Sequence, residues 1–354
     1  RQTFRDHPLA DLRCLEGGQH KPRMGIDQRP SIHDYWTTHR LWRMDGFAQL
    51  VKRDRFKAIR SHVHLVDNDE VTEAMKKNAF YKIQPVLEMF GERCRKVYFC
   101  GKWVSYDEMI AKYEGRQKSK PHNGFKFYGF VDAATGHLFV FEISTKRKTE
   151  PSIHDRLIKL AKQLPGEWHV TAMDNLFVSV NTLRELYKNK VYGVGTVRKG
   201  RGMPSSMCKS GASATGLHAA LSDRGDGSHV TKWADVGDGC ILTASAWMDA
   251  NVTNFLSSYH GDDVTEVKRR KAGVKGRPTK SAPRAAKEYN IYMGGNDRQD
   301  ALNESYPYGK KSQRWYMSIL KWIKSAAMTN AYVIWRVCIA AKRWKLDHKE
   351  FIIA

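Results

Sequence analysis

The chain has 354 residues, of which 41% are hydrophobic and 11% aromatic, a composition that excludes an intrinsically disordered protein. Lys and Arg outnumber Asp and Glu by 60 to 37, and the net charge of +23 favours a polyanionic partner, nucleic acid more than an acidic membrane surface. No apolar run reaches the roughly 18 residues of a membrane span, and the six cysteines lack the paired spacing of a zinc module. We therefore expect a globular, intracellular protein with no membrane partner.

The first 98 residues are predicted to hold an irregular arm followed by helices. Residues 1–31 are polar, rich in Arg, Gln, His and Gly, and show little periodicity, which indicates an irregular basic arm. Over residues 32–98 apolar residues recur at steps of three and four, the spacing of amphipathic helices. We expect this helical region to serve dimerisation or DNA binding.

Residues 99–198 are predicted to form the first part of a mixed α/β core. A strand over 102–110 precedes an aromatic hairpin over 125–132 and 137–144, whose turn contains Gly136. Helices and strands then alternate: a helix over 153–164, a buried strand over 168–175, a helix over 178–190 and a strand over 192–198. This order of elements is typical of an α/β fold.

Residues 199–288 lose this regularity and are predicted to be an insertion domain with a basic loop. Gly, Ser, Asp and Lys dominate, with strand-like pieces near 229–236 and 240–247 and a basic run over 267–287. We expect this segment to be partly folded and partly flexible.

Residues 289–354 return to a helical pattern and are expected to hold the last part of the core and the C-terminal helices. Apolar residues are expected on one face of the long helix: Trp315, Ile319, Ile323, Ala327 and Ile334.

Three carboxylates occupy comparable places on this scaffold. Asp107 is expected in the last positions of one strand, Asp174 ends another, and Asp297 precedes or opens a helix. Functional groups gather beyond the carboxyl ends of strands in open α/β sheets, so Asp107 and Asp174 converge if their strands are neighbours. Oxygen ligands suit Mg²⁺, or Mn²⁺ as a substitute, and two such ions about 4 Å apart can support phosphodiester cleavage. We therefore predict that the three aspartates are catalytic residues and metal ligands.

Each of these acids also has a structural explanation. Asp297 or Asn296 could be the N-cap of a helix, where both residue types are favoured. Asp107 could be a solvated strand end. Asp174 follows an apolar run, so its carboxylate must lie at the rim of the sheet or be paired. Asp300, three residues after Asp297 and on the same helical face, fits an auxiliary metal ligand or a surface ion pair.

The segments around these acids resemble those of piggyBac-family transposases. The matching segments stand in the family's order through nearly the whole chain: RFKAIRSHVHLVDN, SYDEMIAKYEGR, MDNLFVSVNTLREL, YGVGTVRKGRGMP and YNIYMGGNDRQD. The resemblance implies an α/β, ribonuclease H-like catalytic core with an insertion domain, preceded by a helical N-terminal region and followed by C-terminal helices. It places the family's DDD motif on Asp107, Asp174 and Asp297, and the further acid of the last motif on Asp300.

The resemblance also implies a function. It implies cut-and-paste transposition with metal-dependent cleavage and strand transfer at transposon ends, hairpin ends, TTAA targets, a homodimer on double-stranded DNA, and a nuclear location. Asn296 stands where the family usually has Val, and residues 176–179 depart from its Phe-Thr-Ser, but both departures spare the carboxylates. Nothing in the chain resembles the family's C-terminal zinc-binding domain. The alternative is a domesticated DNA-binding protein without catalytic activity.

Three clusters of cations are predicted to contact the DNA backbone. They are Lys112, Arg116, Lys118 and Lys120; Arg198, Lys199 and Arg201; and the start of a basic run, Lys268, Arg269, Arg270 and Lys271. Solvated loop faces, or a nuclear-localisation segment for the third cluster, are the alternatives. Four aromatic residues could stack on unpaired bases, but core packing is expected for most of them: Tyr106, Tyr113, Trp233 and Trp247.

Overall fold

The computed structural model describes residues 24, 26–43, 45–113, 115, 124–145, 150–198, 201, 221, 223–270, 275–306, 312–339 and 346–353. The chain divides into two compact units. The sheet unit comprises Cys94–Ile110 and Lys126–Gln299, and the helical unit comprises Arg1–Arg93, Ala111–Phe125 and Asp300–Ala354. The five-segment domain division expected from the sequence stays a prediction.

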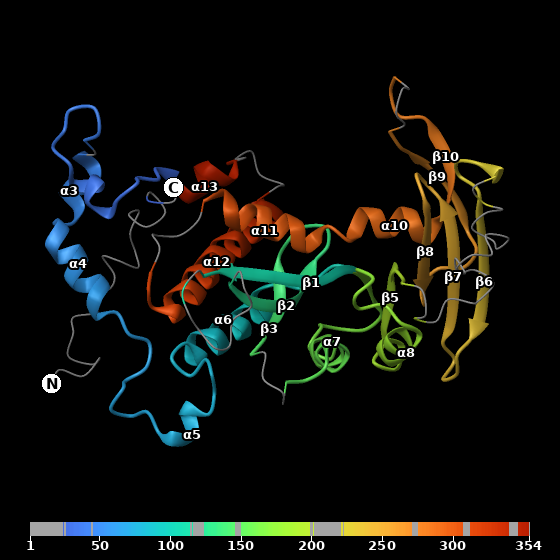
Figure 1. Ribbon diagram of the computed structural model, residues 1–354, viewed down its shortest axis with the longest axis horizontal. Helices are drawn as coiled ribbons and strands as arrows, with labels where there is room; N and C mark the ends of the chain where they lie inside the picture. Colours follow the sequence, from blue (N-terminus) through green and yellow to red (C-terminus); the bar gives the residue numbers. More distant parts are fainter. Residues whose placement is uncertain are drawn as a thin grey trace. The chain divides into compact units, whose positions relative to one another are not determined.

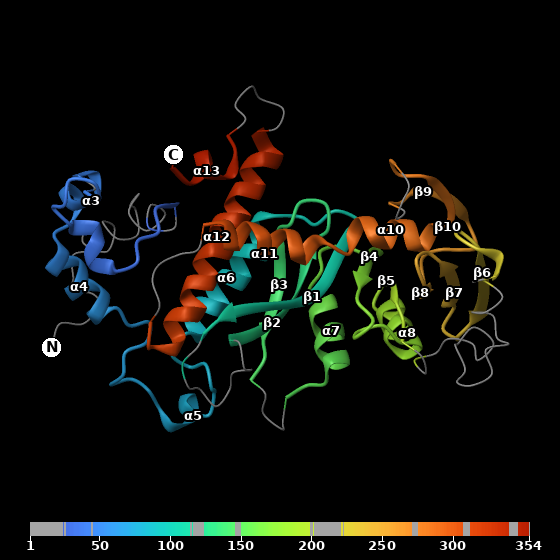
Figure 2. The ribbon, with the colours of Figure 1, turned by 45° about the horizontal axis from the view of Figure 1, so that its top comes forward.

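The sheet unit is built on a sheet with strand order β3-β2-β1-β4-β5-β8-β7-β6 (Figures 1 and 2). The strands foreseen in the first part of the core are present: β1 (Trp103–Lys112), β2 (Gly124–Asp132), β3 (Leu138–Ile143), β4 (His169–Met173) and β5 (Val191–Thr196). β4 is parallel to both β1 and β5, whereas β2 and β3 form an antiparallel pair. The turn of this hairpin contains Gly136, whose positive φ of 86° favours glycine.

Strands from the predicted insertion continue the same sheet. They are β6 (His229–Asp235), β7 (Ile241–Met248) and β8 (Val252–Ser257). β8 pairs antiparallel with β5 and with β7, and β7 pairs antiparallel with β6. The sequence anticipated β6 and β7 but not β8, and not the separate antiparallel pair of β9 (Val264–Lys268) and β10 (Thr279–Pro283).

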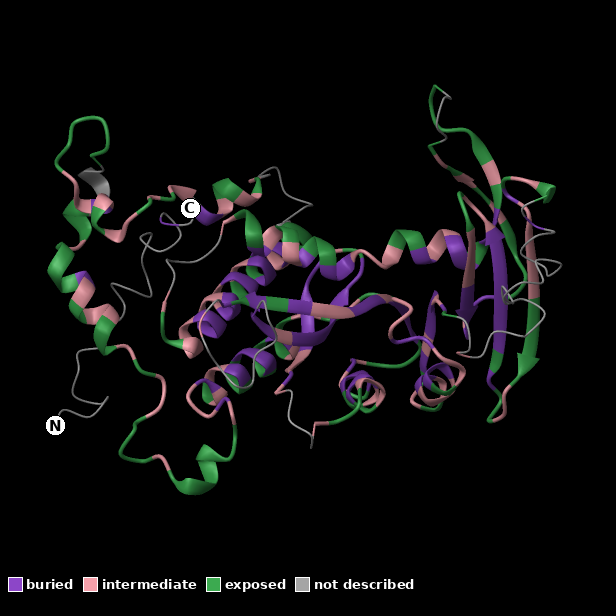
Figure 3. Cartoon of the chain, in the orientation of Figure 1, coloured by how far each residue is buried: buried purple, intermediate pink, exposed green. Residues whose placement is uncertain are grey.

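Helices cover both faces of this sheet (Figure 2). One face carries α7 (Ile153–Ala161) and α8 (Val180–Lys188), and the other carries α10 (Arg284–Tyr292). β4 shows why, because its side chains alternate between the faces: Val170 and Ala172 pack with α10, and Met173 packs with α7 and α8. β4 is accordingly buried along its whole length. Most of β7 is buried too, as its purple colour shows (Figure 3).

Part of the basic run over 267–287 is folded. Its second half contains β10 and the start of α10, and Ala282, Ala285 and Ala286 are buried against the sheet. These residues are folded because small apolar side chains between the cations supply a packing face.

Helices are the main regular elements in the described part of the helical unit. They are η1 (Ile32–Trp36), α3 (Asp45–Leu50), α4 (Arg53–His62), α5 (Glu73–Lys76), α6 (Gln84–Val97), α11 (Gly295–Ser305), α12 (Trp315–Ile339) and α13 (His348–Ile353). The expected helical N-terminal and C-terminal regions are thus present. An aromatic cluster of Phe80, Phe125 and Trp315 lies in the core of this unit, with ring centroids 5.8 to 6.0 Å apart.

The buried face of α12 differs slightly from the predicted one. Ile319 and Ile323 are buried as expected, but Ala327 is exposed and Ala326 is fully buried in its place. The difference of one residue arises because a helix turn has 3.6 residues, so a face predicted in steps of four drifts away from the buried face along the 25 residues of α12.

Candidate active site

Asp107 and Asp174 stand on neighbouring parallel strands. β1 and β4 pair from Trp103↔Val170 to Tyr106↔Met173, and the two aspartates are the next residue on each strand. The register therefore brings them side by side at the carboxyl end of β4. Asp107 is not near the end of β1, as the sequence suggested, because β1 runs on to Lys112 with β2 along its other edge.

Asp297 reaches the same place from α11. It lies in the first turn of that helix, and its charge acts on Asp107 together with the charge of Asp174. Burial first, and then the negative charges of Glu108, Asp297 and Asp174, raise the pKa of Asp107 to about 6, although the backbone N–H of Glu108 opposes this shift. Three carboxylates from β1, the end of β4 and α11 thus form one electrostatic group.

The hydrogen bonds of these carboxylates come from neutral groups. The backbone N–H of Glu108 donates to Asp107 at 2.7 Å, and the backbone N–H of Asn175 donates to Asp174 at 2.5 Å. No three His, Cys, Asp or Glu side chains within the described ranges are already arranged as a metal cage. Like charges repel, so a cation is what would draw the three acids together. Their all-oxygen donor set fits Mg²⁺ or Mn²⁺ better than zinc.

Thr196 and Tyr289 support Asp174 from β5 and α10. The Thr196 hydroxyl donates to Asp174 Oδ1 at 3.4 Å, and Thr196 also shares a hydrogen bond with Tyr289. Burial, partly offset by that hydrogen bond, and the fields of Asp174, Asp107 and Asp297 raise the pKa of Tyr289, so its hydroxyl stays protonated at neutral pH. No periodic pattern in the sequence indicates either role, since both depend on the packing of distant segments.

Asn296 and Asp300, which flank Asp297 in the sequence, lie in different surroundings. Asn296 is buried, and its side chain bonds to Ser105 on β1 and to the carbonyl of Gly129 on β2, so it is not the N-cap of α11. Asp300 is partly buried on α11, three residues after Asp297. Its role as an auxiliary metal ligand stays a prediction.

The second predicted cation cluster lies beside Asp174. Arg198 Nε donates to Asn175 Oδ1 at 2.5 Å, and Arg201 Nη1 donates to the carbonyl oxygens of Asn175 and Leu176 at 3.3 and 2.5 Å. Both guanidinium groups therefore gather at the residue that follows Asp174. Lys199 of this cluster lies outside the described residues.

In each of the other two predicted cation clusters, one described cation lies beside an acid. In the first, Lys112 pairs with Glu304 at 2.5 Å on the surface, and Arg116, Lys118 and Lys120 lie outside the described residues. In the third, Arg269 Nε lies 3.7 Å from Asp249, and its guanidinium lies over the ring of Trp247, 5.8 Å from the centroid. Lys268 and Arg270 are exposed on either side of it, and Lys271 lies outside the described residues.

Three of the four singled-out aromatic residues pack in the core as expected. Tyr106, Tyr113 and Trp247 are 1%, 7% and 1% exposed. Trp233 is the exception, since it lies on β6, the edge strand of the sheet, and is 71% exposed.

These elements define a ribonuclease H-like α/β core: strands β3-β2-β1-β4-β5, helices on both faces, and acids on two adjacent strands and a late helix. The profile of the family described as Transposase IS4 matches residues 22–332. With the relatives described next, this match shows that the chain belongs to the piggyBac family of transposases.

The chain is similar to two human proteins. It is 25% identical over 330 residues to PiggyBac transposable element-derived protein 3 and 26% identical over 335 residues to PiggyBac transposable element-derived protein 2. These alignments cover 88% and 89% of this chain but 51% and 53% of the relatives, so the chain spans about half of their length.

A solved structure shares the fold. The cryo-EM structure of the piggyBac transposase synaptic complex with hairpin DNA superposes with a TM-score of 0.77 at 20% sequence identity, covering 99% of this chain and 71% of that one. The match confirms the predicted fold class. In the part of this chain that the structure describes, the helices are too short or too polar to cross a membrane.

Proposed function

We propose that this protein is a DNA transposase of the cut-and-paste type, which cleaves DNA at transposon ends and transfers the strand to a target with the help of Mg²⁺ or Mn²⁺. The observation that carries the proposal is the electrostatic group of Asp107, Asp174 and Asp297 on β1, after β4 and on α11. In this proposal the three aspartates are the catalytic, metal-binding residues and Asp300 assists them. The fold and the family match support it.

Bound divalent ions would supply Lewis-acid stabilisation of the phosphodiester and a lowered pKa of water. The chain's own residues hold the ligands in place. Asp107 and Asp174 are fixed by paired strands, and Asp297 by the first turn of α11. Arg198 and Arg201 place positive charge beside Asp174, where it can hold a DNA phosphate by charge-assisted hydrogen bonds.

The proposed partners are double-stranded DNA, as transposon end and as target, and a second copy of the chain. The solved relative is a synaptic complex with hairpin DNA, and the net charge of +23 suits a polyanion. Hairpin ends, TTAA targets and a nuclear location belong to the same proposal and rest on the family resemblance.

The proposal is tested by nicking of supercoiled DNA in Mg²⁺. We expect nicking by the wild-type chain and background levels with Asp174→Asn, because this change removes a charged oxygen ligand at nearly constant shape. Asp238→Asn is the matched control: Asp238 is a surface acid that pairs with Arg184 and Lys188. Equal nicking by wild type and Asp174→Asn would refute the assigned site.

A non-catalytic DNA-binding protein is the second candidate. The observation that favours it is that both human relatives are named as transposable element-derived proteins. This candidate predicts duplex binding that weakens steeply with salt and no nicking with Mg²⁺, Mn²⁺ or any other divalent ion. The nicking assay therefore separates the two.

Under either candidate, Lys268 and Arg270 are expected to contact phosphates from the β9–β10 pair. The double variant Lys268→Ala, Arg270→Ala should bind duplex DNA more weakly and lower the salt slope by about 1.8, since each phosphate contact contributes about 0.9. The matched control removes two cations that already pair with acids, Arg184→Ala with Lys188→Ala. A change of slope as large in the control would place the DNA elsewhere.

A further inference from the structure

A buried hydrogen-bonded pair links the strand of Asp107 to the helix of Asp297. The Ser105 hydroxyl donates to Asn296 Oδ1 at 2.6 Å, and the Asn296 backbone N–H donates to Ser105 Oγ at 3.1 Å. Asn296 Nδ2 also donates to the carbonyl of Gly129 on β2 at 3.3 Å. Ser105 is 0% and Asn296 is 2% exposed, so these bonds form away from water.

The backbone before Asn296 is shaped for this contact. A Cβ atom on Gly295 would lie 2.3 Å from Ser105 Oγ and 3.0 Å from the Cα of Ala133. Such distances are too short for a side chain, so glycine is required for α11 to begin this close to β1. The second glycine of the MGG segment therefore serves the approach of helix to strand.

The pair stands next to both acids in the sequence. Ser105 precedes Asp107 by two positions on β1, which places both side chains on the same face of the strand, and Asn296 immediately precedes Asp297. Val104 and Tyr106 point to the opposite face, into the core with α7 and α8. Any shift of Asn296 against Ser105 would therefore move Asp297 relative to Asp107.

We propose that Ser105 and Asn296 are positioning residues that fix the start of α11 on β1 and so set the place of the Asp297 carboxylate in a divalent-metal site. The inference rests on the proposed function for the identity of the ligand. It also explains why a polar residue is stable at position 296, where the family resemblance leads one to expect Val: the Asn side chain finds partners for both its oxygen and its nitrogen.

The test compares Ser105→Ala with a matched control that removes another buried hydrogen bond to α11. Thr329 donates to Asn303 Oδ1 at 2.8 Å, and this buried pair joins α12 to the later part of α11. Thr329→Val removes that hydroxyl as Ser105→Ala removes the other. Three quantities are measured for each variant: the melting temperature, the Mn²⁺ dissociation constant from paramagnetic resonance of the free ion, and the Mg²⁺ concentration for half-maximal nicking.

We expect both variants to melt at lower temperature, but only Ser105→Ala to weaken metal binding. Loss of residues that orient metal ligands typically costs about 10- to 100-fold in affinity, and we expect at least about 10-fold in both metal readouts. Asn296→Val is the second variant and should give the same metal effect if Ser105→Ala fails to fold.

Each outcome decides the inference. Unchanged Mn²⁺ affinity in a folded Ser105→Ala or Asn296→Val protein, or an equal loss in Thr329→Val, overturns it while leaving the transposase proposal intact. A wild-type protein that binds Mn²⁺ but does not nick DNA overturns the proposed activity. In that case the Mn²⁺ dissociation constants of the variants still test whether Ser105 and Asn296 position Asp297. A wild-type protein that binds no Mn²⁺ overturns both.

Discussion

Asp107→Asn is expected to stabilise the metal-free protein and at the same time to abolish metal-dependent DNA cleavage. Burial and the charges of Glu108, Asp297 and Asp174 raise the pKa of Asp107 from 3.8 to about 6. At 1.36 kcal/mol per pKa unit, and allowing for screening at its solvent-facing side, ionised Asp107 costs the fold about 2 kcal/mol. The neutral Asn avoids that cost, so the melting temperature in a chelator should rise at pH 7.5.

The sign of this effect follows from proton linkage. The folded state holds the Asp107 proton up to about pH 6, whereas the unfolded chain releases it near 3.8, so wild-type stability falls as pH rises through this window. Below it the carboxyl is neutral in both states, and wild type and Asp107→Asn should melt alike. Above it the advantage of Asn is complete.

Bound metal is expected to reverse the order of stability, so that wild type becomes more stable than Asp107→Asn. A ligand that binds only the folded state at 100 times its dissociation constant stabilises that state by about 2.7 kcal/mol, so wild type should gain in Mg²⁺ or Mn²⁺ and Asp107→Asn should gain little. Without its metal ions the Asp107→Asn variant loses several kcal/mol of Lewis-acid stabilisation of the transition state. Since each 1.36 kcal/mol corresponds to about a tenfold change in rate, we expect cleavage to be at least about 1,000-fold slower. A variant that is less stable in chelator, or that keeps the metal-induced rise in melting temperature, would contradict this account. Asp238→Asn, which alters an acid already paired with Arg184, is the control for both measurements.

The convergence of the acids could be anticipated because it depends on local patterns. The apolar run before Asp174 and the aromatic hairpin over β2 and β3 identify strands by their alternation, and functional groups of parallel neighbours gather at one edge. Predicting that Asp107 and Asp174 converge then required only one further assumption, that β1 and β4 are neighbours in the sheet. It misplaced Asp107 within β1, since the length of a strand is set by its partner on the far edge, which periodicity does not report.

Long-range contacts account for what the sequence did not reveal. The edge pairing of β5 with β8 joins segments about 60 residues apart, and no local pattern records it. Arg269 reads as one more cation of a basic run until the structure shows it beside Asp249 and Trp247. The link between Ser105 and Asn296 is of the same kind, since each residue alone resembles an ordinary polar neighbour of an acid.

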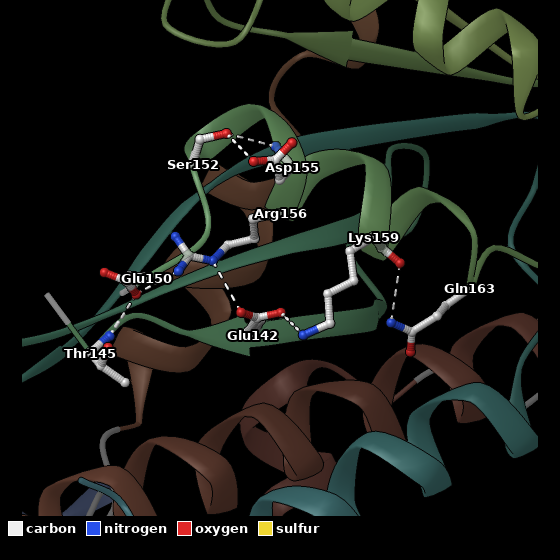
Figure 4. A network of polar contacts seen from close by, with 8 residues as sticks. All are labelled: Glu142, Thr145, Glu150, Ser152, Asp155, Arg156, Lys159 and Gln163. Atoms are coloured by element: carbon white, nitrogen blue, oxygen red, sulfur yellow. Dashed lines mark hydrogen bonds and ion pairs between the residues drawn. The ribbon is translucent and has the colours of Figure 1, made fainter. Parts of the chain in front are cut away.

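Arg156→Ala is expected to destabilise the sheet unit strongly. The Arg156 side chain is 3% exposed on α7, and it bridges Glu142 on β3 at 3.3 Å and Glu150 at 2.5 Å (Figure 4). Its guanidinium also lies over the ring of Tyr128, 4.8 Å from the centroid. Removing one partner of a buried ion pair leaves charge uncompensated, which typically costs about 3–5 kcal/mol. Urea unfolding should show this loss, and Arg156→Lys should lose less because it keeps the charge but not the two-pronged geometry.

The pH dependence separates loss of charge from loss of packing. Burial alone would raise the pKa of Glu150, but hydrogen bonds from Ser144 and Thr145 and the charge of Arg156 outweigh it and hold that pKa below its usual 4.5. The stability that Glu150 contributes in wild type is therefore complete above about pH 4.5 and is lost as pH falls through the lower pKa of the folded state. Without Arg156 the Glu150 carboxylate is buried with no cation beside it to offset its charge. The difference in the free energy of unfolding between wild type and Arg156→Ala should therefore narrow as pH falls below 4.5. Arg156→Met, which restores apolar volume without charge, should show the same narrowing, whereas a gap that is constant with pH would mean that packing against Tyr128 is the larger contribution of Arg156.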